Sequence, residues 1–134
     1  MKINFKELKK PWLGKYAGVT IIPYVFVYYG NKSKKQIAIL KNHELIHAAQ
    51  VTDEINKWCD KVGKIFGTPI GWINWYRNYV GCWLKNILTG YFSTKGMGAN
   101  EAYMAIPAEK EAYANESNLD YLKTRKPFAV NAYK

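Results

Sequence analysis

Apolar residues form two kinds of pattern along the chain, and each pattern predicts a different kind of element. Residues 16–29, YAGVTIIPYVFVYY, are rich in β-branched and aromatic side chains, which is typical of extended backbone. Pro23 lies inside this run, and because proline has no backbone N–H it cannot donate to a strand ladder. The run therefore predicts an edge strand, a bulge or two strands with a break, followed by a turn over residues 30–33.

From residue 33 the spacing changes to a helical period of about 3.6 residues. Ser33 and Gln36 have the spacing of a capping box, in which each residue caps the other at the start of a helix. Gly63 is suited to end the helix, since glycine adopts the left-handed conformation without steric cost. We expect one long helix between these signals. Its apolar positions are Ile37, Leu40, Ala48, Val51, Ile55, Trp58 and Val62.

Residues 70–92 form a second helical pattern, whose apolar positions wrap most of the way round the cylinder. Such a helix is either well buried or lies at an interface. Tryptophan and tyrosine together with Arg77 and Lys85 suit a membrane interface. Aromatic helical stripes are more often packed in a core, so we interpret this helix as core and keep the interface as the alternative.

The C-terminal third predicts a loop and a third helix. Residues 93–102, STKGMGANEA, indicate a glycine-bearing loop. Pro107 opens a helix at the favoured first-turn position, and this helix is expected to continue until just before Pro127. The tail, residues 127–134, is expected on the surface. These elements predict a single domain over residues 1–134, of α+β class and mainly helical, in which a small N-terminal sheet or edge strand packs on the first long helix.

The net charge of the chain indicates which kinds of molecule it can bind. The formal net charge is +10 and the pI is near 9.5, which favours anionic partners. The basic residues are spread along the chain, so a dedicated nucleic-acid-binding face is not expected. An anionic membrane surface, a virion partner or an anionic polymer stays a candidate.

The cysteines and the N-terminal residues indicate the cellular compartment in which the protein is expected. Cys59 and Cys82 lie far apart and in no metal-ligand spacing, so we expect two reduced thiols. The N-terminal residues carry charge without an apolar run behind it, unlike a secretory signal, and polar residues interrupt the apolar segment 70–92. The sequence favours a cytoplasmic protein, and membrane association and a phage origin stay open.

The candidate chemistry centres on His43, Glu44 and His47, and the two histidines are the only ones in the chain. Residues four apart on a helix lie one above the other, so both imidazoles can point a nitrogen at one ion. Zinc accepts histidine nitrogen in tetrahedral sites. The glutamate beside the first histidine can reach a water at the ion without being a ligand. This H-E-x-x-H pattern predicts a zinc site with Glu44 as general base.

A catalytic zinc site uses three protein ligands, so a third must come from elsewhere in the chain. The cysteines are poor candidates, because one lies about four turns further along the same helix and the other lies on the crowded second helix. A carboxylate of the third helix is left. Glu109 is the preferred ligand, since Ala112 one turn later lets two helices approach closely. Glu111 is expected to point away, and Glu116 shares a stripe with Glu109; both stay open as alternatives.

Several segments carry a resemblance to known proteins. NHELIHAAQ followed by IPAEKEAYANE resembles the zincin metallopeptidases of the gluzincin type, whose second helix carries a glutamate ligand in a Glu-x-x-Ala pattern. IIPYVFVYY and YLKTRKPF are similar to segments of a group of small, uncharacterised H-E-x-x-H proteins from Bacteroidetes and their phages. The resemblance covers roughly residues 16–128 and implies a minimal zincin-like fold with Glu109 as a zinc ligand. Typical gluzincins often have Asp or Asn where this chain has Tyr113.

The resulting hypothesis is a zinc-dependent metallopeptidase that hydrolyses peptide bonds. Glu44 takes a proton from the attacking water, and Tyr113 or Tyr103 is a candidate donor to the oxyanion. The predicted edge strand can pair with an extended peptide, while Asn42 and Gln50 are candidates for orienting the imidazoles. The alternative is a non-catalytic protein on a zincin scaffold, with structural zinc, that docks on a membrane surface, a virion partner or an anionic polymer.

Overall fold

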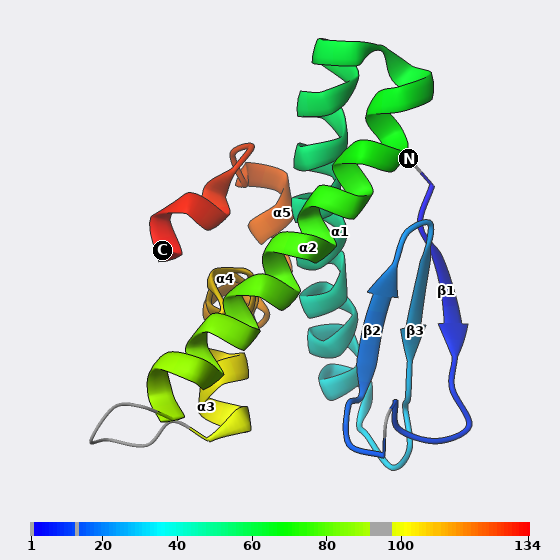
Figure 1. The fold of residues 1–134 in the computed structure, drawn as a ribbon. Coiled ribbons are helices and arrows are strands. Elements are labelled where there is room, and N and C mark those ends of the chain that lie inside the picture. The colour runs from blue at the N-terminus through cyan, green and yellow to red at the C-terminus, as the bar shows by residue number, and fades with distance from the viewer. Residues whose placement is uncertain (1, 13, 92–97) are drawn as a thin grey trace. The chain divides into compact units, whose positions relative to one another are not determined.

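The computed structural model describes residues 2–12, 14–91 and 98–134 (Figure 1). The fold is α+β and mainly helical, with a small sheet near the N-terminus, as the sequence predicts. The elements, in chain order, are β1 (Asn4–Glu7), β2 (Gly18–Ile21), β3 (Tyr24–Val27), α1 (Lys34–Val62), α2 (Lys64–Tyr91), α3 (Ala99–Met104), α4 (Pro107–Asn115), α5 (Tyr121–Thr124) and the 3-10 helix η1 (Ala129–Tyr133).

The chain divides into two units. One comprises Met1–Ala49 and Ala112–Arg125, and the other comprises Gln50–Glu111 and Lys126–Lys134. The dividing points fall inside α1 and α4, so each of these helices contributes residues to both units. The single domain expected from the sequence stays a prediction.

The sheet belongs to the first unit and has the strand order β1–β3–β2, with β1 parallel and β2 antiparallel to β3. Ile22 and Pro23, joined by a cis peptide bond, link β2 to β3, so the option of two strands with a break is confirmed. An edge strand across the whole run is wrong for β3, which pairs on both sides. β1 escapes sequence prediction because its four residues are all exposed and show no apolar alternation.

The start and end of α1 follow the predicted signals. The backbone N–H of Ser33 donates to Oε1 of Gln36 at 2.8 Å, and the backbone N–H of Gln36 donates to Oγ of Ser33 at 3.3 Å. This reciprocal pair is the expected capping box. At the other end, Gly63 follows the helix with a φ of +80°, the left-handed conformation that glycine favours. Both predictions are confirmed.

α2 begins at Lys64, well before the predicted start at residue 70. Pro69 lies in this early part of α2, and a proline inside a helix removes a backbone hydrogen bond. Gly67 and Gly71 lie one turn apart against the backbone of α1 near the C-terminal end of that helix, where an added Cβ would overlap main-chain atoms. This close packing of two helices compensates for the proline, and such a contact is not visible in local sequence.

The loop predicted over residues 93–102 is wrong for residues 99–102, which are helical and belong to α3; residues 93–97 lie outside the described residues. The predicted third helix is also too long. α4 starts at Pro107 as expected but ends at Asn115, and α5 is a separate helical turn. The tail forms η1, whose residues are half-buried or exposed.

A side chain from a distant part of the chain explains the early end of α4. The side-chain nitrogen Nδ2 of Asn42 donates to the backbone oxygens of Asn115, Glu116 and Asn118, at 3.4, 2.9 and 3.0 Å. Carbonyl groups at the end of a helix need such partners, because no further turn supplies them. Asn42 therefore caps the C-terminal end of α4, and the sequence of α4 itself carries no signal for it.

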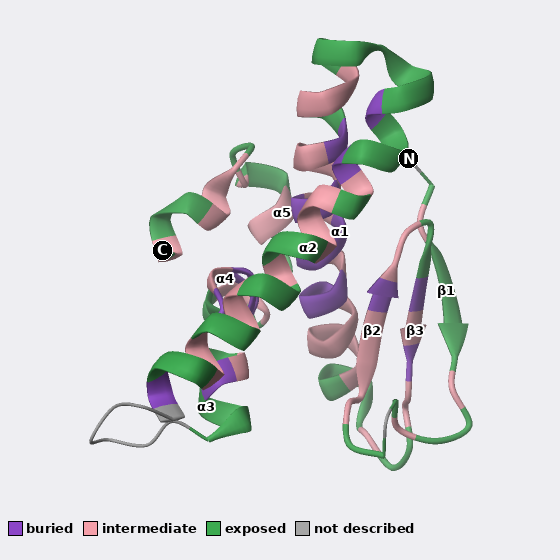
Figure 2. Ribbon diagram, viewed as in Figure 1, coloured by how far each residue is buried: buried purple, intermediate pink, exposed green. Residues whose placement is uncertain are grey.

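Burial differs sharply between the two longest helices (Figure 2). α1 holds buried side chains along its middle, including Ile46, Val51 and Ile55. Among the described side chains of α2, in contrast, the large apolar ones are all half-buried or exposed. The interpretation of residues 70–92 as a core helix is therefore wrong for one face of α2.

Candidate metal centre

The two histidines of the H-E-x-x-H motif lie one turn apart on α1, and both are buried. Nε2 of His43 and Nε2 of His47 are 3.1 Å apart. In a tetrahedral zinc site with bonds of about 2.0–2.1 Å, two ligand atoms lie about 3.3–3.4 Å apart. The pair therefore has nearly the separation that a shared ion requires.

Glu109 on α4 completes a group of three buried residues. One ligand atom from each of His43, His47 and Glu109 lies within 4.8 Å of the others. Two imidazole nitrogens and one carboxylate oxygen at this spacing can hold a metal ion. The structure thus brings together the three residues that the sequence singled out as ligands.

His43 has a carboxylate partner on the side of the ring away from His47. Nδ1 of His43 lies 2.7 Å from Oε2 of Glu116. Because a carboxylate accepts hydrogen bonds, Nδ1 carries the proton, and Nε2 presents its lone pair. A carboxylate that orients a histidine ligand in this way is common at protein metal sites. Glu116, weighed from the sequence as an alternative ligand, has this orienting position in the structure.

Glu109 is held by a residue that the sequence did not single out. The hydroxyl of Tyr79 on α2 donates a hydrogen bond to Oε1 of Glu109. A hydrogen bond to a ligating carboxylate fixes its orientation, as the Glu116 contact does for His43. The chain contains 11 tyrosines, so composition alone offered no way to choose this one.

Glu111 is buried as fully as Glu109 but has a different role. Its Oε2 accepts a hydrogen bond of 3.0 Å from Nε2 of Gln50, which also donates to the backbone oxygen of Ala108 at 3.1 Å. Gln50 thus links the middle of α1 to α4 within the second unit. The expected role of Gln50 as an orienting partner of an imidazole stays a prediction, while Asn42 caps α4 as described above.

Glu44, the predicted general base, is buried and held by β2. Oγ1 of Thr20 lies 2.6 Å from Oε2 of Glu44 and 3.0 Å from its backbone oxygen, so the single hydroxyl proton has two acceptors. Gly18 lies so close to the same carboxylate that a Cβ at this position would overlap it. These contacts pack the sheet on the motif helix. Thr20 was detectable only as a polar residue within an apolar run.

Tyr113, the candidate oxyanion donor, lies beside the motif. Its ring packs edge-on against the ring of His43, with centroids 4.6 Å apart and an interplanar angle of 67°. The residue is 42% exposed, so its side chain is accessible to a ligand. Tyr103 lies on α3 and is half-buried.

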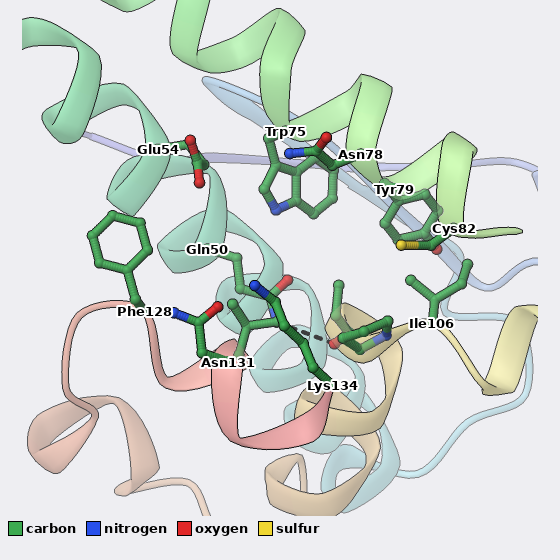
Figure 3. A pocket seen from close by; sticks show the side chains of 13 residues that line it. Gln50, Glu54, Trp75, Asn78, Tyr79, Cys82, Ile106, Phe128, Asn131 and Lys134 are labelled. Carbon is green, nitrogen blue, oxygen red and sulfur yellow. Dashed lines mark hydrogen bonds between the residues drawn. The ribbon is translucent and has the colours of Figure 1, made fainter. Parts of the chain in front are cut away.

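A cavity of about 120 Å³ lies in the second unit, bordered by α1, α2, α4 and the tail (Figure 3). Trp75, Tyr79 and Phe128 supply much of its aromatic wall, and Gln50 and Asn131 supply polar groups. Tyr79 is shared between this cavity and the carboxylate of Glu109. We call His43, His47 and Glu109 the metal group. A ligand in the cavity would therefore contact Tyr79, which is hydrogen-bonded to a member of this group.

Comparison with protein-family models, with curated proteins and with solved structures finds no match to the chain. Across the described ranges, no helix combines the length and the apolar character needed to cross a membrane. The chemistry of the site therefore has to be argued from its own residues.

Proposed function

We propose that this protein is a zinc-dependent peptide hydrolase of the zincin type, in which His43, His47 and Glu109 hold the ion. The observation that carries the proposal is the convergence of three buried donors of the kind that hydrolytic zinc sites use, two imidazoles and one carboxylate. When bound, the ion supplies Lewis acidity, which makes water more acidic and polarises the carbonyl group of a peptide bond.

Glu44 is the proton carrier in this proposal. It follows His43 directly on α1, and its carboxylate accepts a proton from the attacking water and delivers it to the leaving nitrogen. Thr20 supports this role, because its hydroxyl hydrogen bond restricts the carboxylate to one orientation. A fixed base loses less conformational freedom in the transition state than a mobile one.

β2 supports a peptide as the substrate. Within the described sheet, β2 is an edge strand, and its residues Gly18 and Thr20 both contact Glu44. An extended peptide that adds to this edge through backbone hydrogen bonds would run past the general base. Tyr113, packed against His43, is the residue we assign as donor to the developing oxyanion.

The test compares the wild-type chain with Glu44→Gln, a variant that keeps the size of the side chain and removes the base. Both proteins are loaded with zinc, the metal is measured per chain, and both digest the same peptide library. We expect similar zinc content and a loss of cleavage by about 10²–10⁴-fold in the variant. Equal cleavage by both proteins would refute the assignment of Glu44.

A third outcome separates the proposal from the non-catalytic alternative. If the wild-type chain binds zinc stoichiometrically and cleaves nothing in the library, the ion is structural and the peptidase proposal fails. Zinc content and cleavage are measured on the same preparation, so misfolded protein is recognised by its missing metal.

A further inference from the structure

One face of α2 carries an exposed apolar stripe, with Arg77 at its centre. Its members recur at intervals of three, four and, across Arg77, seven residues, and each exposes between 37% and 66% of its surface. They are Phe66, Ile70, Ile73, Val80, Leu84 and Leu88. At about 100° per residue these six positions fall within an arc of about 80°. The stripe runs for about 33 Å, at 1.5 Å per residue.

Among the described residues, the packing contacts of α2 lie on the side opposite to the stripe. Gly71 meets α1, while Trp75 and Tyr79 line the cavity of the second unit, and these residues point roughly opposite to the stripe. Large contiguous apolar surfaces on a protein mark interaction sites, because exposure to water is unfavourable. The stripe therefore needs a partner, and its surroundings indicate which kind.

Charge is the first indication. α2 contains Lys64, Arg77 and Lys85 and no acidic residue, and the whole chain has a formal net charge of +10. Because the charged residues of α2 are all cationic, an apolar stripe on this helix is complementary to an anionic lipid surface, which takes up apolar side chains and attracts lysine and arginine.

Aromatic residues are the second indication. Trp72, Tyr76 and Trp83 border the stripe along one side, and all three are half-buried. The rings of Trp72 and Tyr76 pack with centroids 4.6 Å apart. Tryptophan and tyrosine favour the boundary between headgroups and acyl chains, since each combines an apolar ring with a polar atom.

Arg77 argues against a second copy of the chain as the partner. It lies at the centre of the stripe, so two copies with fully overlapping stripes would bring Arg77 against Arg77 in either orientation. Burying two like charges is strongly unfavourable. At a membrane the guanidinium can instead reach the phosphate groups while its stem lies along the apolar surface.

We propose that the apolar stripe of α2 docks this protein on an anionic lipid bilayer, with α2 lying in the interface. The proposal does not depend on the peptidase activity. It explains the exposed apolar residues of α2 as a membrane-binding surface of the protein and not as part of its core.

The experiment measures co-sedimentation of the full chain with phosphatidylcholine vesicles that contain or lack phosphatidylserine. We expect binding to the anionic vesicles, weaker binding to the neutral ones, and a decrease as salt is added. Leu88→Glu and Ile73→Glu should each weaken binding by about tenfold or more, since each removes one large buried side chain from the contact.

Leu119→Glu is the matched control, because Leu119 is 56% exposed, nearly as much as Leu88 at 58%, and lies outside the stripe. Binding of this variant should equal that of the wild type. Circular dichroism checks that all variants are folded. The proposal is overturned by wild-type protein that stays in solution with anionic vesicles, or by equal loss in Leu88→Glu and Leu119→Glu. A dimer in solution that Leu88→Glu dissociates, without vesicle binding, would also overturn it and identify a second copy as the partner.

Discussion

The metal group and the stripe of α2 reverse the usual distribution of polar and apolar residues in opposite ways. Around the metal group, charged and polar side chains such as Glu44, Glu109 and Glu111 are almost fully buried. Along α2, large apolar side chains are exposed. Buried carboxylates are unfavourable unless they are paired, and exposed apolar stripes are unfavourable unless they are covered. Each reversal therefore fits the ligand proposed for that region, an ion in one case and a lipid surface in the other.

The two regions differ in how far contacts within the protein hold their side chains in place. At the metal site, buried polar groups have partners from distant parts of the chain in three pairs, Thr20–Glu44, Tyr79–Glu109 and His43–Glu116. The stripe needs no such partners, since its residues only have to remain apolar and on one face. Substitutions should therefore have large, position-specific effects at the site and small effects on folding along the stripe.

Apart from the ligands and Glu44, the largest of these effects is expected at Glu116. Replacing Glu116 with Gln removes the carboxylate that orients His43, and we expect zinc affinity to fall by about 10–100-fold. Isothermal titration with zinc measures this. Glu101→Gln is the control, because Glu101 is exposed on α3, and its zinc affinity should match the wild type. Equal zinc affinities in both variants would show that Glu116 does not support zinc binding.

A smaller effect is expected at Thr20. Thr20→Val keeps the shape of the side chain and leaves the buried carboxylate of Glu44 without this hydroxyl. The free energy of unfolding should fall by about 1–2 kcal/mol, as measured by urea denaturation. Thr89→Val removes an exposed hydroxyl that bonds to the backbone of its own helix and should change stability much less. A similar loss of unfolding free energy in both variants would show that the buried Thr20–Glu44 hydrogen bond stabilises the fold no more than an exposed hydroxyl does.

The smallest effect on folding is expected along the stripe. Leu88→Glu should change the free energy of unfolding by less than about 0.5 kcal/mol, because substitutions at exposed positions rarely cost more. Ile106→Glu, at a fully buried position, should prevent stable folding. A strong destabilisation by Leu88→Glu in urea titrations would mean that the stripe is packed in solution, and the contrast between the two regions would disappear.

Local signals in the sequence were sufficient for the features that depend on neighbouring residues. The Ser33–Gln36 capping box, the helix stop at Gly63 and the break at Pro23 follow from backbone chemistry within a few positions. The motif His43–Glu44–His47 is likewise local, because helical spacing alone aligns the two imidazoles.

Features that depend on distant residues could not be predicted. The end of α4 depends on Asn42, more than 70 positions earlier in the chain. Tyr79 and Glu116 were not recognised as partners of the ligands, since their contacts with Glu109 and His43 span 30 and 73 positions. The start of α2 before Pro69 depends on helix packing at glycines. Such contacts are set by the tertiary fold, and a single sequence does not encode them in any short pattern.

Zinc binding by four matched proteins is the decisive measurement for the metal site: the wild type, His47→Ala, Glu109→Gln and Glu111→Gln. Glu111 is the natural control, because it is buried on the same helix two positions from Glu109 and bonds to Gln50. We predict one zinc per chain in the wild type and in Glu111→Gln, and strongly reduced zinc in His47→Ala and Glu109→Gln. Full zinc occupancy in Glu109→Gln, or a loss in Glu111→Gln as large as that in Glu109→Gln, would contradict the proposed site.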